Sequence, residues 1–346
     1  MPFRDIIGHR KLVALLSRSV AGRSLPPSLI FSGPSGVGKQ MAAVATAQAL
    51  NCLALVVRTP GSAALEIPEV DACGTCAACA RIARGVHPDV LLLEPNDKGN
   101  IKIDPVREAI DRAGYRPFEG RRRVTIINQA DGLETSAQNA LLKVLEEPPA
   151  SSVFILVTAL PDTLLTTVRS RCPQLRFRAL ETEDMVSALQ KRGFDERKAR
   201  HAALLADGSV GAALAADGAD VDDVDAREVA FRVLALAATS EDGRRRIEIA
   251  KDLVPKTSGG PASVERDQLA VYLRAMSSLL RDIEAIAASA DDSILANADL
   301  LPNLQRLSAF AGERGRKAFQ AVDGALAALD RYTNAKLVAD WLVLQL

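Results

Sequence analysis

The stretch GPSGVGKQ, residues 33–40, decides the fold of this chain. It contains the phosphate-binding pattern G-x-x-x-x-G-K, in which glycines let backbone N–H groups turn toward phosphate oxygens. A strand is predicted directly before the loop, at 28–32, and a helix directly after it, at 41–50, which is the context that the pattern requires. Lys39 is expected to reach the β- and γ-phosphates. The stretch therefore predicts an α/β nucleotide-binding domain.

The residue after the lysine departs from the pattern. A Ser or Thr normally stands there and ligates the magnesium ion of a bound nucleotide, but this chain has Gln40. The predicted strand 124–127 is of the kind that ends in acidic residues, which hold magnesium and orient water, but here it ends in Asn128 and Gln129. Neither amide can act as a general base. Both departures predict that the chain does not hydrolyse ATP on its own.

The pattern of apolar residues changes at about residue 178. Before that point β-rich runs alternate with helical ones, and several runs are continuously apolar, as in parallel strands covered on both faces. The predicted strands are 28–32, 90–93, 124–127, 153–158 and 175–177, and the predicted helices are 41–50, 106–113 and 135–146. This alternation predicts a three-layer α/β domain with a mainly parallel sheet.

Only helices are predicted after residue 179. Three short ones, 182–192, 196–206 and 209–216, precede an acidic stretch, 217–225, and a helical pattern then continues to the end. We expect three domains: an α/β core at 1–178, a three-helix lid at 179–220 and an all-helical domain at 221–346.

The composition argues against several classes of protein. The 346 residues include 43 basic and 43 acidic ones, and zero net charge argues against a protein whose main task is to bind nucleic-acid phosphates. No apolar run reaches the ~18 residues of a membrane span, and the first residues do not resemble a secretory signal. Five cysteines in such a chain indicate reduced thiols or metal ligands. We therefore expect a cytoplasmic protein without a membrane partner.

Four of the cysteines have the spacing of a metal site. Cys73, Cys76 and Cys79 form a double C-x-x-C, and Cys52 lies just past the helix that follows the phosphate loop. Four thiolates suit a closed, tetrahedral, structural zinc site. Two other interpretations are small buried residues beside an unrelated Cys52, and a redox pair. The third cysteine at the same spacing favours the metal.

Two further segments are distinctive but do not decide a function by themselves. Residues 139–149, NALLKVLEEPP, predict a packed helix that ends at two prolines. The triplet Ser170-Arg171-Cys172 follows a predicted strand and a helical stretch. Arg171 is either a surface charge, as most arginines are, or an arginine finger that reaches a γ-phosphate held by a neighbouring subunit.

In this order, the phosphate loop, the cysteine module, residues 139–149 and the Ser-Arg-Cys triplet resemble the clamp-loader ATPase-like subunits of bacterial DNA polymerase III. Within that family the chain is more similar to the delta-prime type than to the gamma/tau motor type. The features that favour delta-prime are Gln40, Asn128-Gln129, the segment 85–89 (GVHPD) and the end of the chain after the third domain.

The resemblance implies an AAA+ core of the P-loop NTPase type, a small helical lid and a helical collar that assembles a heteromeric ring with gamma/tau and delta subunits. Such a ring opens the sliding clamp and loads it on primer-template DNA, as part of a DNA polymerase holoenzyme. It also implies that Arg171 is a finger in trans and that zinc is bound by Cys52, Cys73, Cys76 and Cys79. The degenerate nucleotide site would comprise Gly33, Gly36, Gly38, Lys39, Gln40 and, as γ-phosphate sensor, Thr158.

One more position departs from the motor subunits. Residues 208–213 (GSVGAA) resemble the second-sensor region of the family, but Gly211 stands where motor subunits carry an arginine. The residues leave open whether ATP or ADP occupies the loop. The leading interpretation is a stator that lends Arg171 to a neighbouring motor. The alternatives are an active gamma/tau-like motor and a zinc-stabilised DNA-binding module.

Overall fold

The structure is a computed structural model that describes residues 2–58, 69–96, 99–206, 208–218, 223–240, 242–254, 262–290, 295–331 and 333–346. The chain forms two compact units. Unit 1 comprises residues 1–196 and 208–211, and unit 2 comprises residues 197–207 and 212–346. The predicted boundary between lid and collar, at residue 220, lies outside the described residues.

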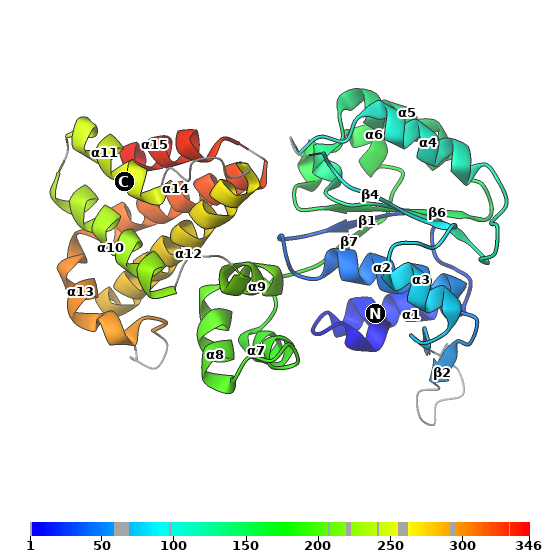
Figure 1. Cartoon of the computed structure of the whole chain (residues 1–346), viewed down its shortest axis with the longest axis horizontal. Helices are drawn as coiled ribbons and strands as arrows, with labels where there is room; N and C mark the ends of the chain where they lie inside the picture. Colours follow the sequence, from blue (N-terminus) through cyan, green and yellow to red (C-terminus); the bar gives the residue numbers. More distant parts are fainter. Residues whose placement is uncertain are drawn as a thin grey trace. The chain divides into compact units, whose positions relative to one another are not determined.

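Unit 1 is built on a parallel five-stranded sheet, which confirms the predicted fold class (Figure 1). The strand order is β4 (Val90–Leu93), β5 (Arg123–Ile127), β6 (Ser152–Thr158), β1 (Ser28–Ser32) and β7 (Gln174–Arg176). Every residue of β1 and β6 is buried, because these central strands are covered on both faces. Ser32 at the end of β1 is paired with Thr158 at the end of β6.

Two layers of helices cover the sheet (Figure 1). One face carries α1 (Arg10–Ala21), α2 (Lys39–Asn51) and α3 (Ala77–Ala83), and the other carries α4 (Ile103–Ala113), α5 (Thr135–Glu146) and α6 (Thr166–Arg169). Alternate residues of the central strands pack into two separate hydrophobic cores, one on each face of the sheet. Phe31 and Ile155 pack on the side of α1 and α2, whereas Ile30 and Phe154 pack on the side of α4 and α5.

Some local elements were not predicted. A two-stranded antiparallel hairpin, β2 (Val56–Arg58) with β3 (Glu69–Asp71), accompanies α3 in the cysteine module. Short 3-10 turns occur at Phe3–Asp5, Ala130–Gly132 and Pro161–Thr163. The predicted helix after the phosphate loop begins two residues earlier than expected, at Lys39, because Gly38 already adopts the left-handed conformation that ends the loop.

The three short helices predicted after the sheet are present as α7 (Thr182–Gln190), α8 (Glu196–Leu205) and α9 (Val210–Gly218). The remaining helices belong to unit 2: α10 (Asp223–Thr239), α11 (Gly243–Leu253), α12 (Ala262–Ala287), α13 (Leu301–Arg306), α14 (Glu313–Asp330) and α15 (Ala335–Gln345), with 3-10 turns at Ala298–Leu300 and Ser308–Phe310. They share one apolar core that includes Leu273, Met276 and Phe310.

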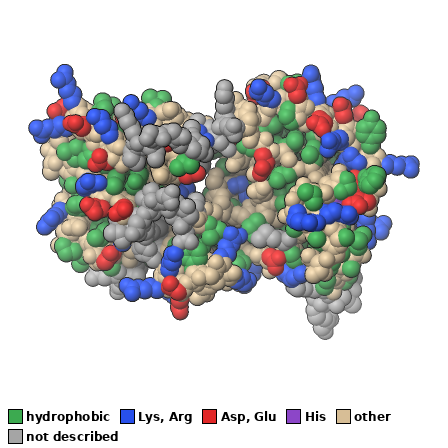
Figure 2. All heavy atoms as spheres, viewed as in Figure 1, with side chains coloured by type: hydrophobic (Ala, Val, Ile, Leu, Met, Phe, Trp, Pro, Cys, Tyr) green, Lys and Arg blue, Asp and Glu red, His purple; other side chains and the backbone are tan. Residues whose placement is uncertain are grey.

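The chain's single tryptophan, Trp341, lies on α15 of unit 2 and is 44 % exposed. Charged and apolar side chains are interspersed on the visible face of the molecule (Figure 2). Within the described residues, every helix is too short or too polar to span a bilayer.

Candidate functional site

The phosphate loop lies at the carboxyl end of β1, where the chain turns into α2 (Figure 1). Close approaches require glycine at two of its positions. A Cβ on Gly33, at φ +140°, would lie 2.1 Å from the backbone oxygen of Phe177. A Cβ on Gly36, at φ +74°, would lie 2.2 Å from Oγ of Ser209 and 3.0 Å from Cα of Gly211. Any side chain would be strained there, so the shape of the loop depends on both glycines.

Every carbonyl group of residues 33–38 accepts a hydrogen bond from the protein. The donors are Lys39 Nζ to Gly33 and Pro34 (2.5 Å each), Ser209 Oγ to Ser35 (2.9 Å), Gly211 N to Gly36 (3.0 Å), His9 Nε2 to Val37 (3.0 Å) and Ala42 N to Gly38 (3.0 Å). The N–H groups of Gly36, Val37 and Gly38, by contrast, have no protein acceptor within the described residues. A loop whose carbonyls are satisfied and whose N–H groups are open can receive an anion at the N-terminus of α2.

The segment 208–211 lies directly on the phosphate loop. A Cβ on Gly211 would lie 2.7 Å from Cα of Gly36, which is closer than real side chains allow. An arginine at position 211, which the resemblance implies for motor subunits, therefore does not fit unless this segment moves away from the loop. Gly211 permits the contact, and Ser209, which the sequence analysis did not single out, strengthens it through its hydroxyl.

The positions that normally hold magnesium carry amides. Gln40, on the first turn of α2, directs Nε2 toward Oε1 of Glu94 at 3.4 Å. Asn128 and Gln129 follow β5 directly, and Gln129 adopts a left-handed conformation with φ +48°. An amide oxygen is a weaker ligand for a hard cation than a carboxylate, and it takes no proton from water at neutral pH.

Thr158, the predicted sensor residue, ends β6 and is fully buried. Its hydroxyl donates to Oδ1 of Asp131 at 2.8 Å, and the N–H of Ala159 donates to the same oxygen at 3.2 Å. Asp131 is the first acidic residue after β5. Its carboxylate is therefore engaged in holding the end of the neighbouring strand.

The four predicted zinc ligands come together. Their sulfur atoms all lie within 4.8 Å of one another, and Cys52 and Cys79 are buried while Cys73 and Cys76 are partly buried. Sulfurs around a tetrahedral zinc ion lie about 3.8 Å apart, so the four are close to a tetrahedral cage. Backbone N–H groups donate to three of the sulfurs: Cys73 to Cys52 at 3.2 Å, Cys76 to Cys73 at 3.3 Å and Cys79 to Cys76 at 3.5 Å.

The surroundings of the sulfurs also suit a metal. The N–H groups of Cys76 and Thr75 lower the pKa of Cys73 to about 6. Burial acts the other way and raises the pKa of Cys52 and of Cys79. Metal ligands must be thiolates, and a bound cation supplies the positive charge that buried thiolates need. The residues thus fit a zinc ion, which these four sulfurs would hold without an open coordination position.

Arg171 lies two residues after α6, and its side chain is 32 % exposed. The guanidinium donates from Nη1 to the backbone oxygen of Thr167 at 2.8 Å and pairs through Nη2 with the carboxylate of Glu146. Within the described residues, no hydrogen bond or ion pair joins Arg171 to the phosphate loop. The neighbouring Cys172 is buried, which raises its pKa to about 11, and it is not one of the four clustered thiols.

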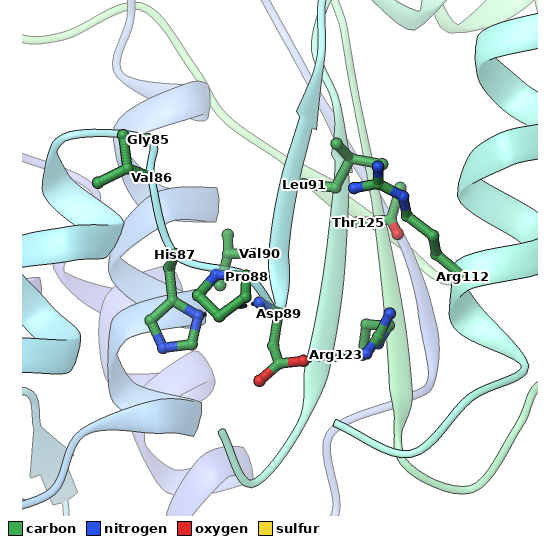
Figure 3. Close-up of a pocket in the computed structure, with 10 residues that line it drawn as sticks. All are labelled: Gly85, Val86, His87, Pro88, Asp89, Val90, Leu91, Arg112, Arg123 and Thr125. Atoms are coloured by element: carbon green, nitrogen blue, oxygen red, sulfur yellow. Dashed lines mark hydrogen bonds and ion pairs between the residues drawn. The ribbon is translucent and has the colours of Figure 1, made fainter. Parts of the chain in front are cut away.

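A cavity of about 210 Å³ lies at the amino ends of β4 and β5, the opposite end of the sheet from the phosphate loop. Residues from both strands and Arg112 of α4 line it (Figure 3). Figure 3 shows the Asp89 side chain beside Arg123, with which it forms an ion pair at 3.0 Å. Burial lowers the pKa of the adjacent His87. We find no pairing of a nucleophile with a base among the lining residues.

Two buried side chains next to this cavity hold the loop between α4 and β5 from inside. The Asp89 carboxylate accepts N–H bonds from Phe118 (2.7 Å), Glu119 (2.9 Å) and Gly120 (2.8 Å), and Oδ1 of Asn51 accepts those of Arg121 (2.9 Å) and Arg122 (3.0 Å). Burial opposes the ionisation of Asp89, but the three N–H groups and Arg123 outweigh it and lower its pKa. Asp89 ends the segment 85–89 that the sequence makes distinctive, but nothing in that segment indicates that its carboxylate holds a loop about 30 residues away.

Comparison with known proteins places these features in a family. Residues 8–181 match the family model described as "DNA polymerase III, delta subunit". Curated relatives include the gamma/tau subunit of Mycobacterium bovis, 32% identical over 55% of this chain and 31% of the relative, and the tau subunit of Escherichia coli, 32% identical over 54% and 27%. The gamma subunit of Buchnera aphidicola is 31% identical over 61% and 56%. The chain thus spans less than a third of the length of these first two relatives.

Solved structures give more distant likenesses. A gamma subunit-related protein of Thermotoga maritima matches with a TM-score of 0.41 and 17% identity, over 94% of this chain and 95% of that one. A clamp loader delta protein of Bacillus subtilis matches with a TM-score of 0.35 and 15% identity, over 95% and 98%. Likenesses at this level carry no argument about function.

Proposed function

The chain belongs to the DNA polymerase III delta subunit family, and from this premise we propose that it is a clamp-loader subunit of the delta-prime type. It serves DNA replication in the cytoplasm as a member of a heteromeric ring with gamma/tau and delta subunits. Its contacts with the sliding clamp and primer-template DNA are made through the assembled ring. In this role it is a stator that does not hydrolyse ATP itself.

The observation that carries the proposal is an asymmetry between two sites in unit 1. The chain's own nucleotide site has amides at Gln40 and Asn128 and a glycine at position 211, so it lacks groups that hydrolysis requires. Arg171 retains the charge and partial exposure that a finger for another subunit needs. We assign to Arg171 the role of contacting the γ-phosphate of a nucleotide bound by the neighbouring subunit.

The geometry supports two bound groups. Zinc would be held by Cys52, Cys73, Cys76 and Cys79 and would stabilise the module around α3. ATP or ADP would place its phosphates on the open N–H groups of the loop, beside Lys39. A bound nucleotide there would contribute to stability and not to turnover.

We also propose that the predicted three domains are functional units. The core at 1–178 carries the sites. Within the lid at 179–220, Ser209 and Gly211 contact the phosphate loop. The all-helical region at 221–346 is the collar that assembles the ring.

An active gamma/tau-like motor is the second candidate, because the relatives that match bear that name and the phosphate cradle is complete. ATP turnover by the isolated chain separates the two candidates. The stator predicts background turnover, unchanged in Lys39→Ala. A rate well above background that disappears in Lys39→Ala would establish the motor.

The trans role is tested in a loader reconstituted with the other subunits. Arg171→Ala should leave ring assembly intact and lower the DNA-stimulated ATPase. Arginine fingers of other phosphoryl-transfer enzymes supply about 10³–10⁵-fold, and a ring with several sites should lose less. Arg169→Ala, on α6, is a matched control, because Arg169 pairs with Asp162 on the surface. Equal ATPase in wild-type and Arg171→Ala rings would refute the proposal.

A further inference from the structure

We infer that Glu146 is a positioning residue for Arg171, holding its guanidinium where the neighbouring subunit's nucleotide can receive it. The inference rests on the trans role proposed above. It adds Glu146, the last residue of α5, to the trans role, because the Ser-Arg-Cys triplet alone does not specify where the guanidinium is held.

The guanidinium is held from two sides by groups of its own chain. Nη1 donates to the backbone oxygen of Thr167, one helical turn earlier, and Nη2 pairs with Oε1 of Glu146. A weaker contact of 3.4 Å joins Nη1 to Oγ of Ser170. The Arg171 side chain nevertheless remains 32 % exposed, so part of the guanidinium is accessible. Two fixed acceptors restrict the many rotamers of an arginine side chain, which makes delivery to a single point less costly in entropy.

The acceptor carboxylate stands on a rigid element. Glu146 is the last residue of α5, and Pro148 and Pro149 follow directly. The helix buries Leu141 and Leu145 in the core beneath it. A side chain at the end of a packed helix has a better defined position than one on a free loop.

The same helix is also tied to the segment before Arg171 near its other end. Gln138 of α5 accepts the N–H of Leu165 at 2.7 Å and donates to the backbone oxygen of Thr163 at 3.4 Å. Helix α5 thus contacts the finger segment at two places, through Gln138 before α6 and through Glu146 after it. We take this double attachment as the reason why a four-residue helix such as α6 can carry a finger in a fixed place.

The carboxylate has two effects that substitutions can separate. It offers an oxygen that fixes the guanidinium, and its negative charge partly offsets the positive charge that a γ-phosphate would meet. Gln at position 146 keeps the oxygen and removes the charge, whereas Ala removes both. If the position of the Arg171 guanidinium decides the rate, Glu146→Gln should keep the DNA-stimulated ATPase and Glu146→Ala should lower it.

The experiment uses the reconstituted loader and measures DNA-stimulated ATPase at varied ATP concentration. We expect Glu146→Ala to lower kcat by about two- to fivefold, the range of an exposed ion pair, with little change in KM for ATP. Glu146→Gln should stay near the wild-type kcat. Glu147→Ala is the matched control, because Glu147 is the adjacent exposed glutamate and no described side-chain contact is lost with it.

Coupling to Arg171 provides the second measurement. In an Arg171→Ala background, Glu146→Ala should cause no further loss, since a positioning residue acts only through the side chain that it positions. An equal additional loss in that background would overturn the inference.

The other outcomes are also decisive. Unchanged kcat in Glu146→Ala, or kcat equally low in Glu146→Gln, would show that the acceptor oxygen does not matter. A higher kcat in both Glu146→Ala and Glu146→Gln would show that Glu146 inhibits the ATPase instead of supporting it. A Glu146→Ala chain that fails to enter the ring would assign Glu146 to assembly. If Arg171→Ala lowers the DNA-stimulated ATPase as expected but any of these results is found for Glu146, the inference is refuted and the proposed function stands.

Discussion

The two ends of the sheet in unit 1 use backbone N–H groups in opposite ways. At the carboxyl end, the carbonyls of residues 33–38 all accept hydrogen bonds from the protein, and the N–H groups of 36–38 have no acceptor in the described part of the chain. At the amino end, five successive N–H groups, those of residues 118–122, are satisfied by Asp89 and Asn51. The Asp89 carboxylate is an anion supplied by the chain itself, whereas the N–H groups of the phosphate loop are placed so that an anionic ligand could bind them. A loop with aligned N–H groups can therefore bind an external anion only where the protein does not supply one itself.

The largest effect should come from removing the internal anion. Asp89→Asn removes the carboxylate that pairs with Arg123 and replaces one of the two oxygens that accept the N–H groups of 118–120 by an N–H₂ donor. Breaking a buried pair in this way costs about 3–5 kcal/mol of unfolding free energy. Hydrogen exchange of the β4 and β5 amides measures the loss in unit 1. Asp111→Asn, at an exposed position of α4, serves as the control and should change the exchange little.

If Asp89→Asn proved as stable as Asp111→Asn, the anchored loop would not depend on its carboxylate, and the contrast between the two ends would disappear.

The next largest effect concerns the backbone of the phosphate loop. Gly33→Ala places a Cβ against the Phe177 backbone at φ +140°, and strain together with a shifted strand should cost about 3 kcal/mol. Gly85→Ala is the control, because Gly85 has φ +71° but no atom within 4 Å of its added Cβ. The conformational strain alone should cost about 1–2 kcal/mol there. Equal losses of stability in the two variants would mean that the contact with Phe177 is not tight.

A bound nucleotide should supply the phosphate loop with the anion that Asp89 supplies to the loop at the other end of the sheet. ADP at a concentration of about a hundred times its dissociation constant should stabilise unit 1 by about 2.7 kcal/mol. The stabilisation should persist in EDTA, because the amides of Gln40 and Asn128 are weak ligands for magnesium. Isothermal titration of the wild-type chain and of Lys39→Ala measures binding directly. Loss of binding in EDTA would show that a metal site survives, and absence of binding under all conditions would make the loop purely structural.

The smallest effect is the pH dependence of the internal anion. The folded state lowers the pKa of Asp89, so the ionised carboxylate stabilises the fold above its unfolded pKa and this contribution is lost as pH falls through the folded pKa. The stability difference between wild type and Asp89→Asn should therefore be constant above about pH 5 and shrink below about pH 4. Urea unfolding at a series of pH values provides the measurement. A difference that grows on acidification would contradict the assignment.

Much of the fold is encoded in local patterns. The predicted strand 28–32 coincides with β1, and 153–158 differs from β6 by one residue, because continuously apolar runs are typical of buried parallel strands. The hairpin of β2 and β3 and the short helix α3 were missed. Their strands have three residues each and the helix has seven, which is too short for a hydrophobic period to be visible.

Spacing along the chain made two arrangements predictable: the strand–loop–helix context of residues 33–40 and the close approach of the four cysteines. The site was not predictable where distant segments meet. Ser209 donates to a residue 174 positions away, and Glu146 pairs with a residue 25 positions away. Both residues lie in segments that the sequence makes distinctive, 208–213 and 139–149. Nothing in either segment indicates which distant residue it contacts, so only the tertiary structure reveals these contacts.

The position of Trp341 has a spectroscopic consequence. Unit 1 contains no tryptophan, since the only one in the chain lies on α15 of unit 2. Intrinsic tryptophan emission therefore reports the melting of the helical unit, whereas unit 1, with the phosphate loop, the cysteine cluster and Arg171, contributes no tryptophan signal. A tryptophan introduced at the exposed Phe118, which is 83 % accessible, would give the sheet unit an emission signal of its own and allow the two units to be followed independently.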